Sequence, residues 1–221
     1  MIRVSSSPSS TGPAGNSSTV TSPTSTRDAI LAAALVEFTA FGYRRAAIEG
    51  IARRADLARA TVYLHYRGKE EIFRDAVTRL HEEHLTAMQS AAADPSADIL
   101  TRLVALLRAR FGRFVELVAS SPSATELYDM HNTLCGDVAT AADKRADKIL
   151  ATALQHAMAA GEIDLTASGL TVKQLATALT DCARGAKGGE GPGASTPTEF
   201  AARLTYGVRA ILAGVRSRSA Q

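Results

Sequence analysis

The chain has 221 residues, of which 46% are hydrophobic and 21% charged, and its formal net charge is +3. This length allows one large domain or two small ones, and the composition is that of an ordinary globular protein rather than a disordered or fibrous one. No uninterrupted apolar run reaches the roughly 20 residues that a membrane-spanning helix requires, so no membrane partner is expected. Aromatic residues make up only 5% and tryptophan is absent, which disfavours a sugar-binding cleft or an aromatic cage.

The positive charge is concentrated in one quarter of the chain. Between Arg27 and Leu80 there are 10 basic and 7 acidic residues, whereas the rest of the chain has 15 of each. Two cysteines, Cys135 and Cys182, are too few for a metal cluster and make a poor disulfide framework. Because the N-terminus also lacks the apolar core of a secretory signal, a reducing cytoplasm is predicted.

The first 80 residues change from a polar tail to a helical pattern. Residues 1–25 are mostly Ser, Thr, Pro and Gly, which predicts a disordered tail; an arm that wraps DNA is the alternative. From Thr26 apolar residues recur at helical spacing until Gly42, which predicts a first helix. Two short helical patterns follow at 48–55 and 59–65, and they fit a helix-turn-helix. Their apolar seam is Ile48, Ile51, Ala52, Leu57 and Val62.

Six further helical patterns predict an all-α remainder. They span roughly 70–92, 97–120, 123–131, 136–160, 171–184 and 198–216. Ser96 is the predicted N-cap of the second of these helices. A glycine-rich loop is predicted over residues 185–197. Val and Ile are scattered through alanine-rich windows, so no strand is expected.

The segment 27–80 resembles the DNA-binding domain of the TetR/AcrR family of one-component transcription regulators. The matching residues are Phe38, Phe41-Gly42-Tyr43, Ile48-Glu49, Ile51-Ala52, Ala55, Leu57, Thr61-Val62-Tyr63, His65-Tyr66, Lys69-Glu70 and Phe73. The resemblance implies a helix-turn-helix DNA-binding domain over residues 26–73 and a helical regulatory and dimerisation domain over residues 74–216.

A recognition helix at 59–65 predicts which side chains reach DNA. Val62 must pack inward, which turns its neighbours toward the major groove. Arg59 can donate two hydrogen bonds to a guanine, and the methyl group of Thr61 can touch a thymine methyl. The family resemblance implies that Tyr63 and His65 contact phosphates, with a base as the alternative for Tyr63. Lys69 is also expected on a phosphate, joined by the amides at the start of the next helix. The predicted DNA contacts are Arg44, Arg45, Arg59, Ala60, Thr61, Tyr63, Leu64, His65 and Lys69.

Several of these residues have a structural alternative. His65 could be a core or capping residue, and Tyr66 and Phe73 are expected in the core. Arg53 and Arg54 are predicted to lie on a solvated helix face that only raises the local potential.

The sequence departs from the family pattern near the turn. Where relatives have Thr-Thr, this chain has Ala46-Ala47, so Glu49 loses its capping-box partner. Asp56 replaces the usual turn glycine and is expected to adopt the left-handed conformation. Ala58 stands where a serine is common. Fewer neutral hydrogen bonds to the DNA backbone imply a greater dependence on Arg and Lys, and hence strongly salt-sensitive DNA binding.

The resemblance also implies a homodimer formed by the last two long helices, and therefore a palindromic operator. The pattern permits this, although such apolar stripes are equally expected in a core. One stripe is Leu175, Ala178, Leu179 and Cys182, and the other is Phe200, Leu204, Gly207, Val208, Ile211 and Leu212.

A small-molecule effector pocket is expected between the helices of the regulatory half. Its candidate residues are His84, Met88, Arg110, Phe114, Tyr128, His131 and Asp181, with Phe111 and Asn132 beside them. Phe111 and Phe114 could be plain core, and Arg110 could face solvent. His81 and His84, three residues apart, could ligate a metal, but no third ligand is identifiable, so neither metal nor cofactor is expected.

These features predict a cytoplasmic, homodimeric, ligand-responsive transcription factor, with a repressor as the leading interpretation. Its expected partners are double-stranded DNA, a second copy of the chain and an unidentified effector that moves the fourth helix. The alternatives are an activator or dual regulator, a DNA-binding module whose helical half only dimerises, and an enzyme with its site in that half. The enzyme is disfavoured because the sequence has no nucleophile–base motif, Gly-rich phosphate loop or metal-ligand cluster.

Overall fold

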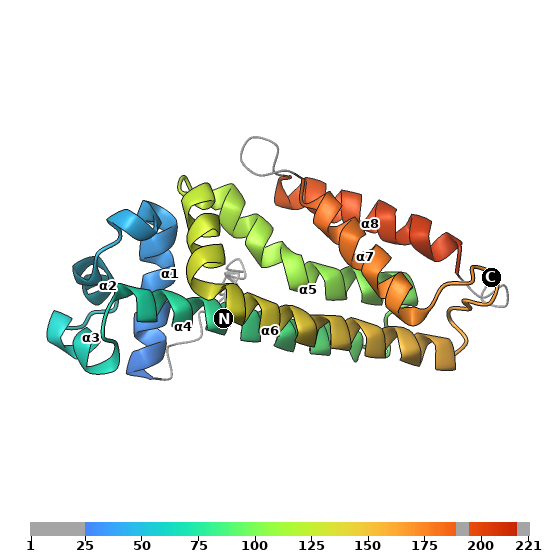
Figure 1. The fold of residues 1–221 in the computed structure, drawn as a ribbon, viewed down its shortest axis with the longest axis horizontal. Helices are drawn as coiled ribbons and strands as arrows, with labels where there is room; N and C mark the ends of the chain where they lie inside the picture. The colour runs from blue at the N-terminus through green and yellow to red at the C-terminus, as the bar shows by residue number, and fades with distance from the viewer. Residues whose placement is uncertain (1–24, 189–194, 216–221) are drawn as a thin grey trace, which may run out of the picture.

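The computed structural model describes residues 25–188 and 195–215. Within these ranges the chain forms eight α-helices and no β-strand (Figure 1), which confirms the all-α prediction. The helices are α1 (Thr26–Arg45), α2 (Ile48–Arg54), α3 (Arg59–His65), α4 (Lys69–Ala92), α5 (Ile99–Ser120), α6 (Ala124–Ala159), α7 (Val172–Ala186) and α8 (Pro197–Ala213). The predicted N-terminal tail lies outside the described residues except for Ser25, as does the middle of the predicted glycine-rich loop.

The fold has two buried clusters joined by α4. We call α1 to α3 with the first turns of α4 the helix-turn-helix end; its core includes Val62 and Phe73. The rest of α4 and α5 to α8 form the helical body, whose core includes Leu85 and Met88 of α4. Figure 1 shows α4 leaving the helix-turn-helix end and running beside α6 into the body. A movement of α4 would therefore be felt in both clusters.

The turns of the helix-turn-helix end follow the local sequence. Gly42 has φ +77° and interrupts α1, but the helix resumes and ends at Arg45 rather than at Gly42 as predicted. A side chain at position 42 would collide with Glu126 of α6. Asp56 adopts the left-handed conformation, with φ 55°. Ala47 is the N-cap of α2 and provides no side-chain hydrogen bond, so the predicted loss of the capping box is confirmed.

A buried ion pair joins α1 to α2. Glu37 is only 4% exposed, and its Oε2 accepts a hydrogen bond of 2.6 Å from Arg54 Nε. Gly50 packs directly on this carboxylate, since any Cβ at position 50 would overlap Glu37. The prediction that Arg54 lies on a solvated face and only raises the local potential is therefore wrong, because Arg54 is paired with buried Glu37. The prediction missed the pair because its partners lie 17 residues apart in two different helices.

A second buried group ties α3 to α4. Tyr66 is almost fully buried, and its hydroxyl donates to Asp75 Oδ2 at 2.6 Å. Arg27 of α1 donates to the same oxygen at 2.8 Å and lies over the Tyr66 ring. Burial is the main cause that raises the pKa of Tyr66, and the hydrogen bond to Asp75 raises it further, so the hydroxyl stays a donor. Tyr66 and Phe73 are core residues, as predicted.

Helix boundaries in the body required two corrections. The N-cap of α5 is Asp98, which accepts from the Thr101 amide at 2.7 Å, and not Ser96. Ser96 is engaged elsewhere, because its hydroxyl and amide both donate to Asp94 Oδ1. Both residue types are common N-caps, so the local sequence alone did not separate them.

The two helices predicted at 123–131 and 136–160 form a single element, α6. It is interrupted only at Cys135, where φ is -128° and ψ is 16°. The guanidinium of Arg74 from α4 donates to the Leu134 carbonyl beside this kink and to both carboxylate oxygens of Asp137. Cys135 is buried in the core of the helix-turn-helix end, and burial raises the pKa of its thiol to about 11. It therefore acts as a small apolar core residue.

The apolar stripes of α7 and α8 are largely buried within the chain itself. Each helix begins with a capping box, at Thr171 and Thr196. The two helices approach closely where Gly207 faces Cys182, because a Cβ on Gly207 would overlap the Cys182 sulfur. The buried stripe residues are Leu175, Leu179, Phe200, Leu204, Val208 and Leu212. Most of the apolar surface predicted for a dimer interface is thus internal core.

Candidate nucleic-acid interface and internal cavity

The recognition-helix candidate, α3, is anchored through one residue. Val62 is fully buried, and Arg59, Ala60 and Tyr63 are exposed around it, as the sequence predicted. His65 is exposed as well, so it is not a core residue. Leu64 is 83% exposed, an unusual position for a large apolar side chain. An exposed leucine beside basic residues suits contact with thymine methyl groups or sugars rather than solvent.

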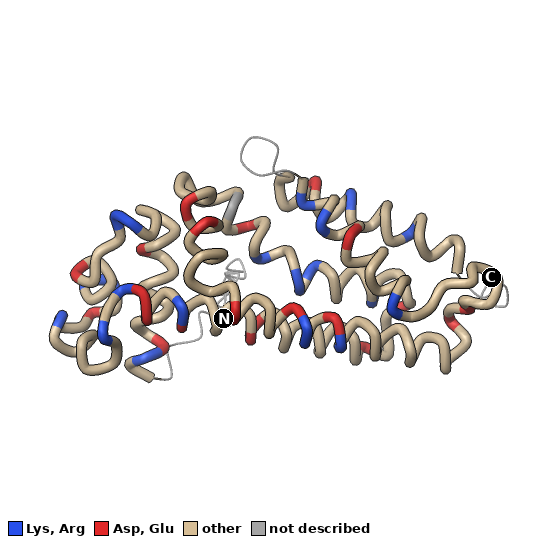
Figure 2. Tube along the Cα trace, in the orientation of Figure 1, with Lys and Arg blue, Asp and Glu red and all other residues tan. Residues whose placement is uncertain are grey.

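Basic side chains surround this helix. From Arg44 to Lys69 there are seven basic residues against Glu49 and Asp56, and Figure 2 shows basic positions gathered at this end of the molecule. Arg44, Arg45, Arg53 and Arg59 are all exposed. Such a surface attracts polyanions from a distance and binds their phosphates.

Arg59 is held in place on the surface of α3. One of its terminal nitrogens is 2.5 Å from Glu49 Oε1, and the other donates to the Tyr63 hydroxyl at 3.1 Å. The hydrogen bond to Tyr63 is the main cause that raises the pKa of Arg59, and the negative charge of Glu49 raises it further. A guanidinium oriented in advance loses less conformational freedom when it binds a base edge. Glu49 also opposes DNA, because its carboxylate repels phosphate.

Lys69 lies at the first turn of α4 and holds the end of α1. Its ammonium donates to the carbonyls of Arg44 and Ala46, each at 3.0 Å, and lies over the Tyr43 ring. It thereby supplies donors to carbonyls that the end of α1 leaves without helical partners. A phosphate contact by Lys69 stays a prediction, and it would share the ammonium with these carbonyls.

A cavity of about 350 Å³ lies between α4, α5 and α6 and reaches α1 and α7. Its walls are mainly leucine, alanine and phenylalanine side chains. Six of the predicted pocket residues line it: His84, Met88, Arg110, Phe114, Tyr128 and His131. Phe111 and Asn132 line it too. Asp181 does not, because it is exposed on α7, where it lies 3.6 Å from Arg184.

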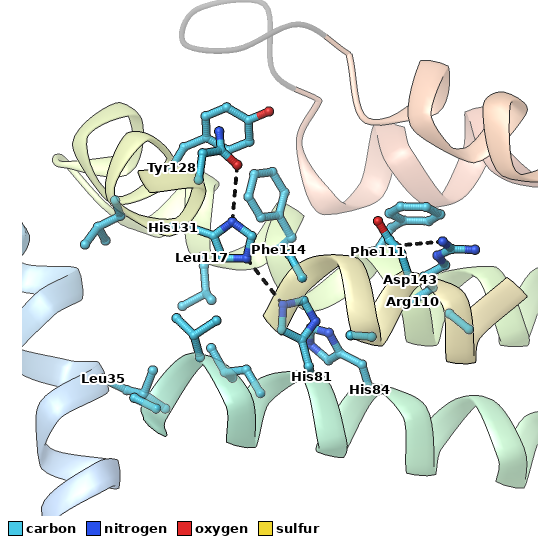
Figure 3. Close-up of a pocket in the computed structure, with 18 of the residues that line it drawn as sticks. Leu35, His81, His84, Arg110, Phe111, Phe114, Leu117, Tyr128, His131 and Asp143 are labelled. Carbon is cyan, nitrogen blue, oxygen red and sulfur yellow. Dashed lines mark hydrogen bonds and ion pairs between the residues drawn. The ribbon is translucent and has the colours of Figure 1, made fainter. Parts of the chain in front are cut away.

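Three histidines meet at the cavity wall (Figure 3). His81 and His84 come from α4, and His131 of α6 faces them, with 3.3 Å between the Nε2 atoms of His81 and His131. Burial, followed by the neighbouring imidazoles of His131 and His84, lowers the pKa of His81 to about 4. Burial also lowers the pKa of His84. The sequence analysis placed His84 in the pocket but considered His81 only as a possible metal ligand together with His84.

Arg110 is buried at the cavity wall rather than facing solvent, with 7% of its surface exposed. Its two terminal nitrogens donate to Asp143 and Asp147 of α6, both at 2.7 Å. Lys187 lies 4.3 Å above the Phe114 ring. The cavity thus has cationic groups at the α5 and α7 side. Sequence reasoning missed Lys187 because it lies in a segment predicted only as a loop.

The first part of α6, residues 124–134, touches both the cavity and the helix-turn-helix end. Tyr128 and His131 line the cavity. Glu126 accepts a hydrogen bond of 2.6 Å from the Arg44 amide, just beyond the Gly42 interruption of α1. The Ser121 hydroxyl, in the preceding turn, donates to the Thr39 carbonyl at 2.8 Å. No sequence signal pointed to Glu126, because its partner is 82 residues away.

Two absences bear on the chemistry. Among residues 25–188 and 195–215, no group of three His, Cys, Asp or Glu side chains is arranged to hold a metal ion. None of the helices in these ranges is both long and apolar enough to cross a membrane.

Comparison with solved structures places this fold among known regulators. A protein from Mesorhizobium loti MAFF303099, assigned to the TetR family of transcriptional regulators, superposes with a TM-score of 0.67 at 19% identity, over 86% of this chain and 96% of its own. SmeT, the repressor of the Stenotrophomonas maltophilia multidrug efflux pump SmeDEF, superposes with a TM-score of 0.59 at 20% identity, over 89% of this chain and 93% of its own. The fatty acid degradation regulator FadR from Bacillus halodurans superposes with a TM-score of 0.54 at 18% identity, over 87% of this chain and 97% of its own.

At these identities the structural likeness establishes the fold. SmeT is also known as a complex with triclosan. No curated protein matches the chain by sequence. Residues 30–76, however, match the family model of bacterial regulatory proteins of the tetR family, and this span contains α2, α3 and the basic surface described above. The resemblance of the helix-turn-helix segment to the tetR family is thereby confirmed over residues 30–76, and the solved structures show that the whole described chain shares this fold.

Proposed function

We propose that the protein is a homodimeric repressor that binds a palindromic operator through α3 and leaves it when a small molecule occupies the cavity. The observation that carries this proposal is α3, whose one buried residue, Val62, turns Arg59, Tyr63 and Leu64 outward on a basic surface. Arg59 reads a guanine, while Arg44, Arg45 and His65 hold phosphates. Ala60 and Thr61 contribute close apolar contact. The domains are a helix-turn-helix unit over 26–73 and a regulatory unit over 74–216.

The cavity supports an effector site because two of the helices that form its walls, α4 and α6, also reach the helix-turn-helix end. His81, His84 and Met88 lie on α4, which begins beside α3 at Lys69. Tyr128 and His131 lie on the first part of α6, which contacts α1 through Glu126. A ligand that favours a different spacing of α4 and α6 therefore changes the position of α3 in each subunit. Release follows if that ligand binds the DNA-free arrangement more tightly.

Dimerisation through α7 and α8 uses their outward faces, since the apolar stripes are internal. Ala178 and Ala210 are small and exposed there, and Tyr206 is 67% exposed. An exposed tyrosine among small residues is a typical interface anchor. Sedimentation is expected to give a dimer that Tyr206→Asp weakens, whereas Thr152→Asp on the exposed face of α6 leaves it unchanged. A wild-type monomer at operator-binding concentrations would contradict the proposal.

The deciding experiment selects bound sequences from a random DNA pool and places the winner in a promoter. A palindrome is expected, and transcription in vitro is expected to fall when the protein is added. An increase in transcription would instead establish the activator, which shares the same fold. Selected sequences without two-fold symmetry would contradict the proposal that a symmetric dimer binds the operator.

A further inference from the structure

The cavity has an apolar wall interrupted by a compact imidazole cluster. The rings of His81 and His84 are 6.1 Å apart, and those of His81 and His131 are 5.6 Å apart. His131 Nδ1 is 3.4 Å from Asn132 Oδ1, and an amide oxygen only accepts hydrogen bonds. His131 Nδ1 therefore faces an acceptor, and the Nε2 atoms of His81 and His131 share one hydrogen bond. These two histidines satisfy each other.

His84 is different from the other two. Within the described part of the chain, its Nε2 is buried and has no hydrogen-bond partner, and the same is true of Arg110 Nε. Leaving a buried polar nitrogen without a partner is costly, so His84 Nε2 calls for a partner that the described chain does not supply. Figure 3 places His84 beside His81 on the α4 side of the cavity, opposite Phe114 and Tyr128.

Among the described residues that line the cavity, cationic side chains outnumber carboxylates. Arg110, Arg184 and Lys187 line it, with Asp143 as the lining carboxylate. The carboxylates of Asp143 and Asp147 are bound by the terminal nitrogens of Arg110, and Asp181 lies 3.6 Å from Arg184, so each of these carboxylates is already paired with a cation. The remaining charged groups that act on the two α4 histidines are Glu82, Glu83, Arg113 and Glu116. Glu82 is bound by Arg145, Glu83 by Arg79 and Glu116 by Arg113, so none of these carboxylates is an uncompensated negative charge at the site.

We propose that the cavity takes an apolar carboxylic acid, bound as its anion with the carboxylate on His84 and with the uptake of one proton from solvent by the imidazole cluster. This inference rests on the proposal that the cavity is the effector site. The ligand's hydrocarbon part lies against Leu, Met and Phe side chains. Burial lowers the pKa of His81 and His84, and an adjacent carboxylate opposes this effect by favouring the imidazolium. The charge-assisted hydrogen bond that results is about twice as strong as a neutral one.

The test uses two series of probes that differ only in the polar group. One comprises biphenyl-4-carboxylate, its carboxamide and the corresponding aminomethyl compound; the other comprises decanoate, decanamide and decylamine. Titration calorimetry of the full-length protein at pH 7 is expected to show at least one carboxylate binding about tenfold more tightly than its amide and amine. Titrations in phosphate and in Tris are expected to reveal the uptake of about one proton with the carboxylate and none with the amide. Tighter binding of an amide or an amine, carboxylate binding without proton uptake, or no binding in either series would overturn the proposal.

A matched pair of variants assigns the proton to the cluster. His84→Gln keeps a hydrogen-bonding side chain of similar size but cannot become a cation. It is therefore expected to weaken binding of the carboxylate probe about tenfold and to remove the proton uptake. The affinity for the amide probe is expected to stay within threefold of the wild-type value. His156→Gln on the exposed end of α6, away from the cavity lining, is expected to change neither value. Equal proton uptake in His84→Gln and wild type would remove His84 from the proposed role.

The ligand class and the regulatory function can fail separately. Operator binding is measured with and without each bound probe. If a carboxylate binds with proton uptake but operator affinity does not change, the ligand class stands and the effector function of the cavity falls. If a neutral or cationic probe binds and releases the operator, the effector function stands and the ligand class falls.

Discussion

The helix-turn-helix end and the cavity treat buried polar groups in opposite ways. At the helix-turn-helix end, the Glu37 carboxylate is paired with Arg54, and the Tyr66 hydroxyl is bonded to Asp75. Around the cavity, Arg110 Nε and His84 Nε2 have no partner among the described residues. Complete pairing fixes one arrangement of three short helices, which a surface that must match DNA requires. Unpaired groups leave a site that a ligand can complete.

The largest expected effect follows from breaking the buried pair at the helix-turn-helix end. Arg54→Met leaves the Glu37 carboxylate buried between α1 and Gly50 without its cation. The free energy of unfolding is expected to fall by about 3 kcal/mol, at the low end for such pairs because Arg54 is itself partly exposed. Urea unfolding measures it, with Arg53→Met on the same helix as the control expected to stay within about 0.5 kcal/mol. Equal losses in both variants would contradict the pairing argument.

The next effect separates base reading from phosphate binding. Arg59→Ala is expected to weaken the selected operator about thirtyfold while leaving random DNA almost unaffected, because a lost bidentate contact to guanine removes discrimination. Arg45→Ala is expected to weaken both DNAs equally and to reduce the salt dependence by about one counterion. Fluorescence anisotropy at several salt concentrations measures both variants. The assignment of Arg59 to a base fails if the variant loses affinity equally for operator and random DNA.

A smaller effect concerns the link between the two regions. Glu126→Gln keeps a side chain of the same shape but makes its oxygen a weaker acceptor for the Arg44 amide, because the charge is removed. Ligand affinity in the cavity is expected to stay unchanged, whereas the ratio of operator affinities without and with the tightest of the carboxylates described above is expected to fall about tenfold. Asp129→Asn, exposed one turn along the same helix, is the control. An unchanged ratio in Glu126→Gln would show that α4 alone carries the signal.

The smallest effect is a dependence of stability on pH that originates in the cavity. The pKa of His81 is about 4 in the folded protein and about 6.5 in an unfolded chain, so the unfolded chain binds more protons between these values. Stability is therefore present in full above pH 6.5 and is lost as the pH falls toward 4. After allowance for solvent screening, His81 accounts for about 1 kcal/mol of this loss.

Unfolding in urea between pH 7 and pH 4.5 tests this effect. His81→Gln is expected to show a shallower loss than the wild type, and His156→Gln the same loss. Carboxylates such as Asp137, whose pKa Arg74 lowers to about 2, contribute mainly below this window. Identical pH profiles for His81→Gln and wild type would contradict the assignment.

Local signals in the sequence predicted the helix-turn-helix end well. Its helices are short and bounded by turn residues, so Gly42 and the buried Val62 could be placed from spacing, whereas the left-handed Asp56 was placed from the family pattern. The body was predicted less well at its boundaries. Asp98 and Ser96 are both suitable N-caps, and the choice was made by the contact between Ser96 and Asp94. At Cys135 a local pattern that suggested two helices corresponds to one kinked helix, and the side chain of Arg74 bonds to the Leu134 carbonyl beside the kink.

The cavity shows the same division. Helical spacing placed His84 and Met88 on one face of α4, and six of the seven predicted ligand residues line the cavity. Asp181 lies outside the lining, because a periodic pattern does not say which face of α7 is turned outward.

The sequence by itself determined the all-helical class, the helix-turn-helix, its exposed recognition residues and the concentration of positive charge around them, because these depend on periodicity, turn residues and composition within short windows. Tertiary structure decided the pairs that join distant segments: Glu37 with Arg54, His81 with His131, and Glu126 with the Arg44 amide. Such pairs arise only when helices far apart in the chain pack together. They distinguish a fixed DNA-binding surface from a cavity that a ligand can complete.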